Sequence, residues 1–281
     1  MTIEDKNYSR TLNATNGLAF NLKYIADKQN LSWYNKQEYL QKQCEYCAFT
    51  SSKKEPIHSL IRSGVSLFND HELLVADIHA GEYIGVHLKH MLNIVDENKG
   101  AAIAFEGSKN APIKKYHFSC HFIADKNRLP ITTDLNKNYN KVIFSQNNLS
   151  ISILDVYGRN PIYITSSSAD VLVDTFHKVE KQIGVNYSTN SHPYINLVIW
   201  KEDNKYILAA IPRVVYKPTE FYDETNLWDI APGVLEMSGL YLISNHSEFI
   251  SVNVEQLQEI ANEVSFSNSH ILEIINTLDL S

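Results

Sequence analysis

The chain has 281 residues, of which 44% are hydrophobic and 20% are charged, and this composition is ordinary for a globular protein with an ample core. A formal net charge of −7 argues against a general nucleic-acid binder, which needs a basic face to neutralise phosphates. It leaves room for a small phosphorylated ligand held by a few local cations.

The N-terminal stretch and the cysteine count bear on location. MTIEDKNYSRTLNATNG lacks the apolar region of a signal peptide, and no apolar run approaches the roughly 20 residues that span a bilayer. Three cysteines, two of them close together, do not make a secreted disulfide framework. We therefore expect a cytoplasmic protein without a membrane partner.

The first part of the chain is expected to form strands around one amphipathic helix. Residues 1–16 are polar and predict a loose lead-in, and a short helix is expected at 32–43. Apolar residues at helical spacing predict the amphipathic helix at 81–98, on which His87 and His90 would be solvated. The expected strands lie within residues 17–30, 58–70, 71–81, 100–112 and 116–124.

The second part continues this mixture. Two strands are expected within 141–167, and Ser167 or Ser168 would cap the helix that follows at 169–183. The remaining predicted elements are a hairpin at 194–213, a compact segment at 231–244, a helix at 251–267 capped by Asn253, and a helix at 268–278. Because strands and helices mix without strict alternation, the predicted fold class is α+β with largely antiparallel sheet.

Cys44 and Cys47 form a C-x-x-C pair, which suggests half of a zinc site or a redox pair. The redox interpretation expects a helix that opens at the first cysteine, but the loop-like AFTSSKKEP follows, so we favour a metal. Two structural thiols are the alternative. No second C-x-x-C exists in the sequence, so histidines would have to supply the other zinc ligands.

The stretch His117-Phe-Ser-Cys-His121-Phe carries the main candidate for catalysis. In a strand, successive side chains alternate between faces, so His117, Ser119 and His121 would share one face. Phe118, Cys120 and Phe122 would face the core. Two imidazoles and a hydroxyl on one line predict a catalytic strand; an edge strand with two solvated histidines is the alternative.

With these pieces in order, the chain resembles the galactose-1-phosphate uridylyltransferase branch of the histidine-triad superfamily. It is most similar there to bacterial relatives that also resemble nucleoside-diphosphate-sugar and dinucleoside-tetraphosphate phosphorylases. The resemblance covers most of the chain and rests on an ordered set of segments: AFN at 19–21, Cys44-x-x-Cys47, NDHELLV closed by His79, Gly107 with Lys109, the histidine strand, LPI at 129–131, IPR at 211–213 with Lys217-Pro218, and PGVLEMSG at 232–239.

The resemblance implies a single domain over 1–281, made of two related α+β halves at about 17–183 and 194–281, packed around one site. It implies nucleotidyl transfer through a covalent nucleotidyl-histidine, in which an imidazole attacks the α-phosphorus and a second phosphate acceptor later takes the nucleotidyl group. The partner would be a nucleotide or nucleotide sugar. Relatives often form dimers, so a homodimer is one expected state.

The resemblance also implies a structural zinc ion and a phosphate-binding loop. The zinc ligands would be Cys44, Cys47, His79 and one residue of the 117–121 strand, which we expect to be His117. The substrate-binding residues carried over are Gly107, Lys109, Asn110, Arg213, Lys217 and Glu236. For Lys109, Arg213 and Lys217 a solvated position is the alternative, and for Glu236 a structural ion pair with a partner such as Arg213 is the alternative.

The histidine strand departs from the family pattern of H-x-H-x-Q or H-x-H-x-H, and two registers are open. In one, His117 binds zinc and Ser119 occupies the nucleophile position, so the nucleophilic imidazole would be missing. In the other, which we favour, His121 is the nucleophile and Ser119 replaces the first histidine, with a bulge letting His117 reach the metal. The supporting glutamine is absent in both.

Two functions follow from these observations. The first is a nucleotidyltransferase or phosphorylase that acts on a nucleotide or nucleotide sugar through His121. The second is a degenerate member that keeps the fold but binds a nucleotide or a protein partner, or catalyses a different reaction in the same pocket.

Overall fold

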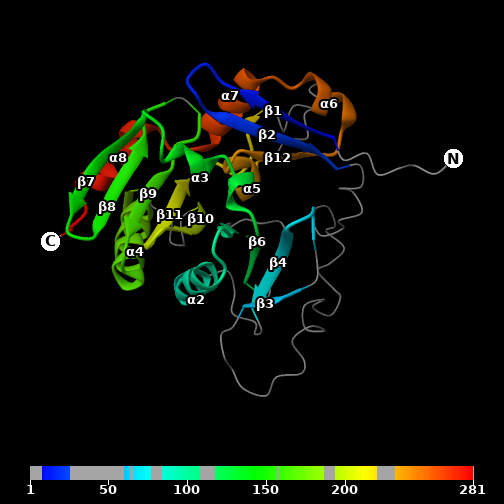
Figure 1. Ribbon diagram of the computed structural model, residues 1–281. Coiled ribbons are helices and arrows are strands. Elements are labelled where there is room, and N and C mark those ends of the chain that lie inside the picture. Colours follow the sequence, from blue (N-terminus) through cyan, green and yellow to red (C-terminus); the bar gives the residue numbers. More distant parts are fainter. Residues whose placement is uncertain are drawn as a thin grey trace, which may run out of the picture.

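The computed structural model describes residues 8–25, 60–63, 66–76, 84–107, 118–156, 158–186, 194–219 and 232–280. These residues form a nine-stranded sheet with helices on one face and a smaller, three-stranded sheet on the other (Figure 1). The predicted α+β class with largely antiparallel pairing is confirmed.

The nine-stranded sheet has the order β3-β4-β6-β5-β10-β11-β9-β8-β7, and every neighbouring pair in it is antiparallel. The predicted hairpin is its centre, and the histidine strand β6 lies between β4 and β5. The strand bounds are β3 (Leu60–Arg62), β4 (His71–Ala76), β5 (Ala102–Glu106), β6 (Ser119–Ile123), β7 (Asn140–Gln146), β8 (Leu149–Leu154), β9 (Ile162–Ser166), β10 (Ile195–Glu202) and β11 (Lys205–Pro212).

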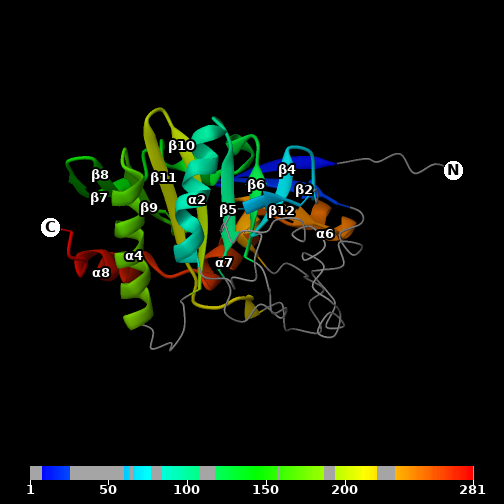
Figure 2. The same cartoon turned by 90° about the horizontal axis from the view of Figure 1, so that it is seen from below.

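One face of this sheet is covered by three helices (Figure 2). They are α2 (Ile84–Glu97), α4 (Ala169–Asn186) and α8 (Asn268–Asn276). Each presents an apolar stripe to the sheet, as amphipathic helices do. Ser168 accepts a hydrogen bond from the Val171 amide at 3.4 Å, so of the two predicted caps of α4 it is Ser168 that forms one.

The other face meets a three-stranded sheet of order β1-β2-β12, in which β12 runs parallel to β2. A second apolar cluster fills the space between the two sheets. Asn253 caps α7 in a reciprocal arrangement with Gln256, as predicted. The elements on this side are β1 (Ser9–Asn13), β2 (Ala19–Tyr24), β12 (Leu240–Ile243), α5 (Val234–Met237), α6 (His246–Ser251) and α7 (Val254–Val264), with η3 (Lys126–Arg128) and α3 (Ile131–Asp134) beside them.

The expected loose lead-in at 1–16 is wrong for its described part, because β1 pairs along its full length with β2. No β1 residue is fully buried, so the strand is held by main-chain hydrogen bonds and has no apolar alternation to reveal it. The stretch 141–167 holds three strands where two were expected. Asn147, at a φ of 53°, makes the tight turn that separates β7 from β8.

The expected solvated position of His87 is also wrong. His87 is fully buried, and its ring stacks on Phe118 with 4.1 Å between centroids. On α2 it lies one turn from Ile84 and Met91, which also face the sheet, so the apolar stripe includes the histidine. His90 is partly exposed.

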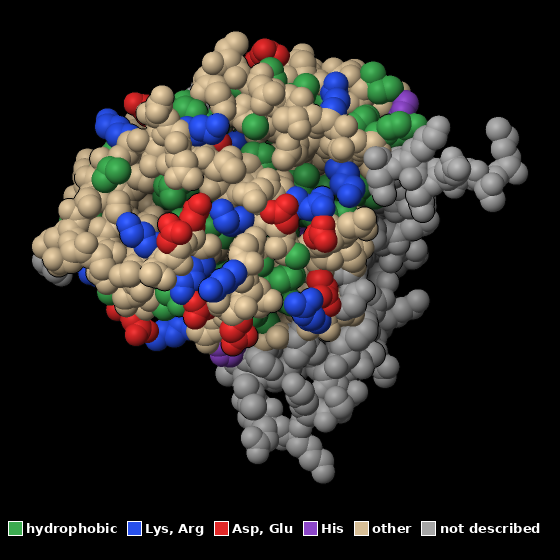
Figure 3. Space-filling model, viewed as in Figure 1, with side chains coloured by type: hydrophobic (Ala, Val, Ile, Leu, Met, Phe, Trp, Pro, Cys, Tyr) green, Lys and Arg blue, Asp and Glu red, His purple; other side chains and the backbone are tan. Residues whose placement is uncertain are grey.

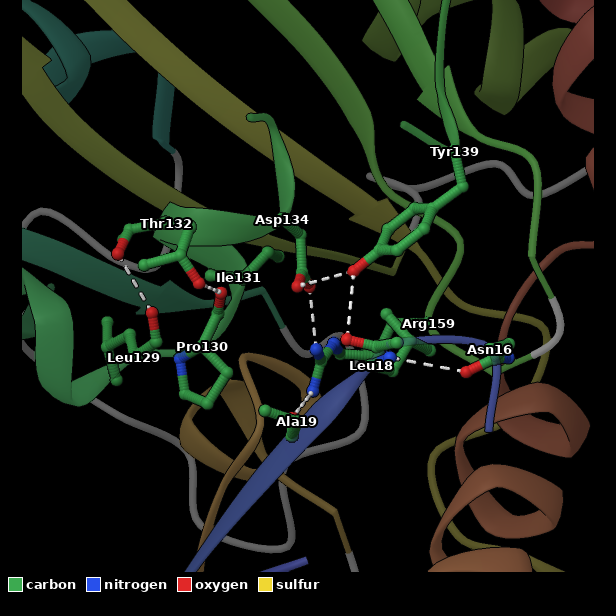
Figure 4. A network of polar contacts seen from close by, with 12 residues as sticks. Asn16, Leu18, Ala19, Leu129, Pro130, Ile131, Thr132, Asp134, Tyr139 and Arg159 are labelled. Carbon is green, nitrogen blue, oxygen red and sulfur yellow. Dashed lines mark hydrogen bonds and ion pairs between the residues drawn. The ribbon is translucent and has the colours of Figure 1, made fainter. Parts of the chain in front are cut away.

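A buried ion pair joins the small sheet to the large one (Figure 4). Arg159 is fully buried; its Nη2 donates to Asp134 Oδ2 at 2.6 Å and its Nη1 donates to the Ala19 carbonyl of β2 at 2.9 Å. Gly239, which has a φ of 94°, lies so close to Arg159 that a Cβ at this position would collide with Arg159 Nη1. The Ile131 amide donates to the Ser238 carbonyl at 3.0 Å.

This network gives LPI at 129–131 and PGVLEMSG at 232–239 a structural role, because the two segments are bonded to each other through Ile131 and Ser238, and Gly239 lies beside Arg159. In the described part of the chain, no helix is long and apolar enough to cross a membrane.

Candidate functional site

His121 lies on the face of β6 that looks toward the small sheet, opposite Leu73 of β4. The predicted alternation is confirmed, because Phe118, Cys120 and Phe122 belong to the apolar cluster on the helix side. The hydrogen-bond partner of His121 comes from the neighbouring strand β4. His71 Nε2 and His121 Nδ1 are 2.9 Å apart.

His71 is a neutral, buried imidazole with a defined tautomer. Only 5% of the residue is exposed, and burial lowers its pKa from 6.5 to about 4. The Leu67 amide donates to His71 Nδ1 at 3.0 Å. A neutral imidazole whose Nδ1 accepts carries its proton on Nε2, so His71 donates to His121 Nδ1.

The tautomer of His71 determines which nitrogen of His121 carries a proton. Because its Nδ1 accepts a hydrogen bond, neutral His121 carries its own proton on Nε2 and presents a donor there. An imidazole nitrogen attacks phosphorus with a lone pair, which this tautomer does not offer at Nε2. In this arrangement, His121 is therefore a hydrogen-bond donor at Nε2 and not a nucleophile.

A second group of polar side chains lies on the same face of the sheet, toward the ends of β5, β10 and β11. Glu106 of β5 pairs with Asn196 of β10, and Arg213 follows β11 with its amide bonded to the Tyr194 carbonyl at 2.9 Å. If the pairing of His121 with Ala104 is continued by two residues, Ser119 falls opposite Glu106. We call Glu106, Asn196, Arg213, Glu236 and Tyr241 the polar site.

Glu236 and Tyr241 reach the polar site from the opposite layer. Glu236 lies on α5, which packs on β5 and β10. Its Oε2 accepts from the Gly233 amide at 2.9 Å and its Oε1 from the Leu242 amide at 3.4 Å. A Cβ at Gly233 would lie 2.9 Å from Glu106 Oε2 and 3.2 Å from Glu236 Oε2, so the two carboxyl groups flank this glycine.

Several atoms of the polar site are buried without a hydrogen-bond partner among the described residues. They are Glu106 Oε1, both Asn196 side-chain atoms, Arg213 Nε and Nη1, and the Tyr241 hydroxyl. Asn196 is 0% exposed and Arg213 is 3% exposed. Leaving such a group unpaired costs roughly 1–3 kcal/mol, so this concentration of donors and acceptors is suited to a polar ligand.

The charges of the polar site influence one another. Burial lowers the pKa of the Arg213 guanidinium, and the nearby Glu106 and Glu236 oppose that effect. An arginine starts so high that it stays charged. Burial raises the pKa of the Tyr216 phenol, and Glu106, which accepts its hydrogen bond, raises it further. Tyr216 is therefore a neutral donor to Glu106.

The predicted site residues fall in different parts of the structure. Arg213 and Glu236 come together in the polar site, and Ser119 and His121 share the neighbouring strand. Gly107 has its amide 3.2 Å from the Ile195 carbonyl, and a Cβ there would collide with that oxygen, so it is a close-approach glycine. The calls that lie outside the described residues are Cys44, Cys47, His79, Lys109, Asn110 and His117.

Lys217 is half-buried, four residues beyond Arg213. In the described ranges, no group of three or more His, Cys, Asp or Glu side chains could hold a metal ion. Because all four expected zinc ligands are outside those ranges, the zinc site stays a prediction.

Four residues of the histidine pair and the polar site were not expected from the sequence: His71, Glu106, Asn196 and Tyr241. Asn196 carries a readable signal, since it is the one amide in the apolar run YINLVIW. His71 carries none, because its partner is 50 residues away.

No protein-family model matches the sequence, and no curated protein matches it. Among solved structures, the chain is similar to yeast Ap4A phosphorylase Apa2, with a TM-score of 0.63 and 12% identity over 92% of this chain and 87% of that one. The complex of that enzyme with Ap4A gives a TM-score of 0.61 and 9% identity over 92% and 90% of the two chains. At these identities the likeness concerns the fold alone: the predicted α+β fold with mostly antiparallel sheets flanked by helices is confirmed, and it is similar to the fold of that phosphorylase.

Proposed function

We propose that the protein acts on a nucleotide or nucleotide sugar by nucleotidyl transfer or phosphorolysis, with the ligand lying across the polar site and His121. The observation that carries this proposal is the set of buried donors and acceptors in the polar site that have no hydrogen-bond partner among the described residues. It is supported by the likeness in fold to a solved phosphorylase that is described in complex with Ap4A.

The polar site offers complementary groups for such a ligand. Arg213 Nε and Nη1 are charged donors, which suit phosphate oxygens. Glu106 Oε1 and the Asn196 amide can accept from and donate to sugar hydroxyls. In the proposal, Lys109, Asn110 and Lys217 add further contacts to the phosphates.

The proposed intermediate is a nucleotidyl group on His121. For Nε2 to attack the α-phosphorus, its proton must leave, and the leaving phosphate takes the electrons of the broken P–O bond. A tautomer with its proton on Nδ1 would meet this need, but His71 would then have to accept through Nε2 and give up the Leu67 amide. Ligand binding would have to drive that exchange.

The hydrogen bonds from the Leu67 amide to His71 and from His71 to His121 favour a second candidate function. If His71 keeps its tautomer throughout, His121 donates a hydrogen bond from Nε2, and the protein binds the nucleotide, or catalyses a different reaction in the same pocket, without forming a covalent adduct. This is the non-transferase alternative.

Intact-protein mass spectrometry separates the two candidates. The protein is incubated with a panel of nucleoside triphosphates, dinucleoside polyphosphates and nucleotide sugars. Nucleotidyl transfer predicts a nucleotidyl-mass adduct that acid removes, that His121→Ala abolishes, and that His90→Ala, a histidine on the opposite face of the sheet, leaves intact.

Calorimetric titration with the same panel tests the alternative. Binding that Asn196→Ala weakens, without any adduct, supports the non-transferase function. Neither adduct nor binding with any member of the panel would contradict the proposed function.

A structural zinc ion and a homodimer belong to this proposal. Two thiolates and two imidazoles, from Cys44, Cys47, His79 and His117, are a closed tetrahedral donor set of the kind zinc prefers. Native mass spectrometry should then give one zinc per chain, lost in Cys44→Ser, and the mass of two chains.

A further inference from the structure

The turn that leads into β4, at residues 67–70, supplies the hydrogen bond that orients the histidine pair. The His71 ring meets the Leu67 amide, four residues earlier, only because the chain reverses direction between them. A hydrogen bond of 3.2 Å from the His71 amide to the Phe68 carbonyl closes this reversal. The conformation of the 67–70 turn therefore determines whether His71 Nδ1 has its donor.

Asp70 occupies the strained position of this turn. Its φ is 66°, which lies in the left-handed region that glycine adopts freely and that asparagine and aspartate adopt more often than other residues. The Asp70 carbonyl accepts a hydrogen bond of 2.8 Å from the amide of Ala124, the residue that follows β6. In its left-handed conformation, Asp70 thus joins the 67–70 turn to the strand that carries His121.

The buried Phe68 holds the turn against the histidine pair. Its ring belongs to the apolar cluster between the two sheets, and its centroid lies 4.8 Å from that of the His71 ring. Lys23 Nζ of β2 lies 5.1 Å from the centre of the same Phe68 ring. The Phe68 carbonyl also accepts from the Ser66 hydroxyl at 2.6 Å. Because the ring is packed and the carbonyl has two donors, the turn keeps the Leu67 amide on His71.

The ion pair between Asp70 and Arg128 contributes less than these backbone contacts. In this pair, 48% of the Asp70 side chain and 37% of the Arg128 side chain are exposed. Exposed ion pairs contribute little, and Figure 3 shows acidic and basic side chains interspersed over the face it presents. We therefore attribute the effect of residue 70 to its φ and not to its charge.

We propose that Asp70 is a positioning residue whose left-handed conformation locks the tautomers of His71 and His121. While the turn holds, the Leu67 amide keeps the proton of His71 on Nε2, and this proton in turn keeps that of His121 on its own Nε2. When the turn opens, His71 Nδ1 loses its donor and can carry the proton. His71 Nε2 then accepts from Nδ1 of His121, which presents a lone pair at Nε2. Each ring exchanges one proton with water, so neither ring changes its charge.

The lock is a property of the free protein, and only its consequence for catalysis rests on the function proposed above. A nucleophilic His121 needs the lone pair at Nε2 and hence the open turn. A His121 that only donates a hydrogen bond needs the closed turn. Opening of the 67–70 turn is therefore the step at which the site would change from one role to the other.

Asp70→Val and Asp70→Gly test the lock in the free, full-length protein. Both substitutions remove the carboxylate and its ion pair, but only the β-branched valine disfavours a positive φ. Two-dimensional ¹⁵N–¹H correlation of the imidazole nitrogens should show the Nε2–H form of His121 in the wild type and in Asp70→Gly. Asp70→Val should lose this form in favour of a mixture of tautomers. The same His121 nitrogen shifts in both variants, whether changed or unchanged, would overturn the proposal.

Asn147→Val is the control for a merely structural effect. Asn147 has a φ of 53° in the turn between β7 and β8, at the far edge of the nine-stranded sheet. It should lower the melting temperature about as much as Asp70→Val does and leave the His121 nitrogens unchanged, whereas an equal change at His121 would overturn the proposal. Should Asp70→Val not fold, Asp70→Ala provides the same comparison with glycine. These spectra need no substrate, so a chain that forms no nucleotidyl adduct can still show the lock.

Discussion

His71 Nε2 and His121 Nδ1 share a hydrogen bond of 2.9 Å, and the Leu67 amide on the far side of His71 sets its direction. This hydrogen bond distinguishes the histidine strand from a strand whose histidine can act as a nucleophile without changing its tautomer. It fixes where the proton of His121 sits, and hence whether that ring can attack or only donate. Four measurable consequences follow from this pair and from the contacts that support its sheet.

Replacing His71 with phenylalanine should release the tautomer of His121. In the wild type, Nδ1 of His121 accepts and Nε2 carries the proton; without His71 that constraint is gone. Two-dimensional ¹⁵N–¹H correlation of the imidazole nitrogens should show His121 moving from the Nε2–H form toward a mixture. Identical His121 nitrogen shifts in wild type and His71→Phe would refute the assignment, and His90→Gln serves as the unaffected control.

Stability should fall as the medium is acidified, in a window set by His71. Its pKa is 6.5 unfolded and about 4 folded, so between these values the unfolded chain binds more protons and acid favours unfolding. The contribution is fully present above pH 6.5 and is lost as the pH falls to about 4, with a total of about 3 kcal/mol. Urea unfolding at pH 7.5, 6 and 5 measures it, and His71→Phe should show a correspondingly shallower dependence. Parallel curves for the two proteins would argue against a neutral, buried His71.

Breaking the buried ion pair should destabilise the whole protein. Arg159→Met leaves the Asp134 carboxylate buried without its cation, at a cost of about 3–5 kcal/mol. Lys89→Met breaks the exposed pair of Lys89 and Asp170 and should leave the midpoint of urea unfolding unchanged within error. Equal midpoints for the two variants would contradict a joining role for Arg159.

Alanine substitutions at Gly239 and Gly100 form a matched pair that tests the contact with Arg159. Both have positive φ, 94° and 85°, so alanine carries a similar backbone strain of about 1–2 kcal/mol at each. A Cβ at Gly100 has no atom within 4 Å, whereas at Gly239 it would collide with Arg159 Nη1. Thermal unfolding should therefore show a larger loss for Gly239→Ala than for Gly100→Ala, and equal losses would mean that the Arg159 side chain moves away freely.

Much of the architecture could be predicted from local patterns. The alternation in the histidine strand and the helices predicted at 81–98 and 169–183 appear in the structure, the latter as α2 and α4. The cap predicted at Ser167 or Ser168 forms at Ser168, and the predicted cap at Asn253 also forms. Each of these depends on residues within a few positions of one another, and side-chain periodicity encodes such relationships directly. The fold type was predicted in another way, from the resemblance of the ordered motifs to a known family.

The site itself was only half predictable. Arg213, Glu236, Ser119 and His121 were expected. Arg213 does come together with Glu106 and Asn196 through the antiparallel register of β5, β10 and β11, and Glu236 reaches them from α5. Asn196 was missed because its burial depends on the layer that covers it. The strand β1 was missed because main-chain hydrogen bonds hold it, and these leave no hydrophobic pattern.

Residue order alone was enough to place a histidine on the inner face of a strand, since alternation along one strand needs no partner. The state of that histidine came from elsewhere: a ring 50 residues away, and an amide at 67 that orients it. Hydrogen-bond direction, burial and pKa arise from contacts between distant segments, and those contacts exist only once the strands have paired. That is why the chemistry of His121 could be located from the sequence but its protonation required the folded chain.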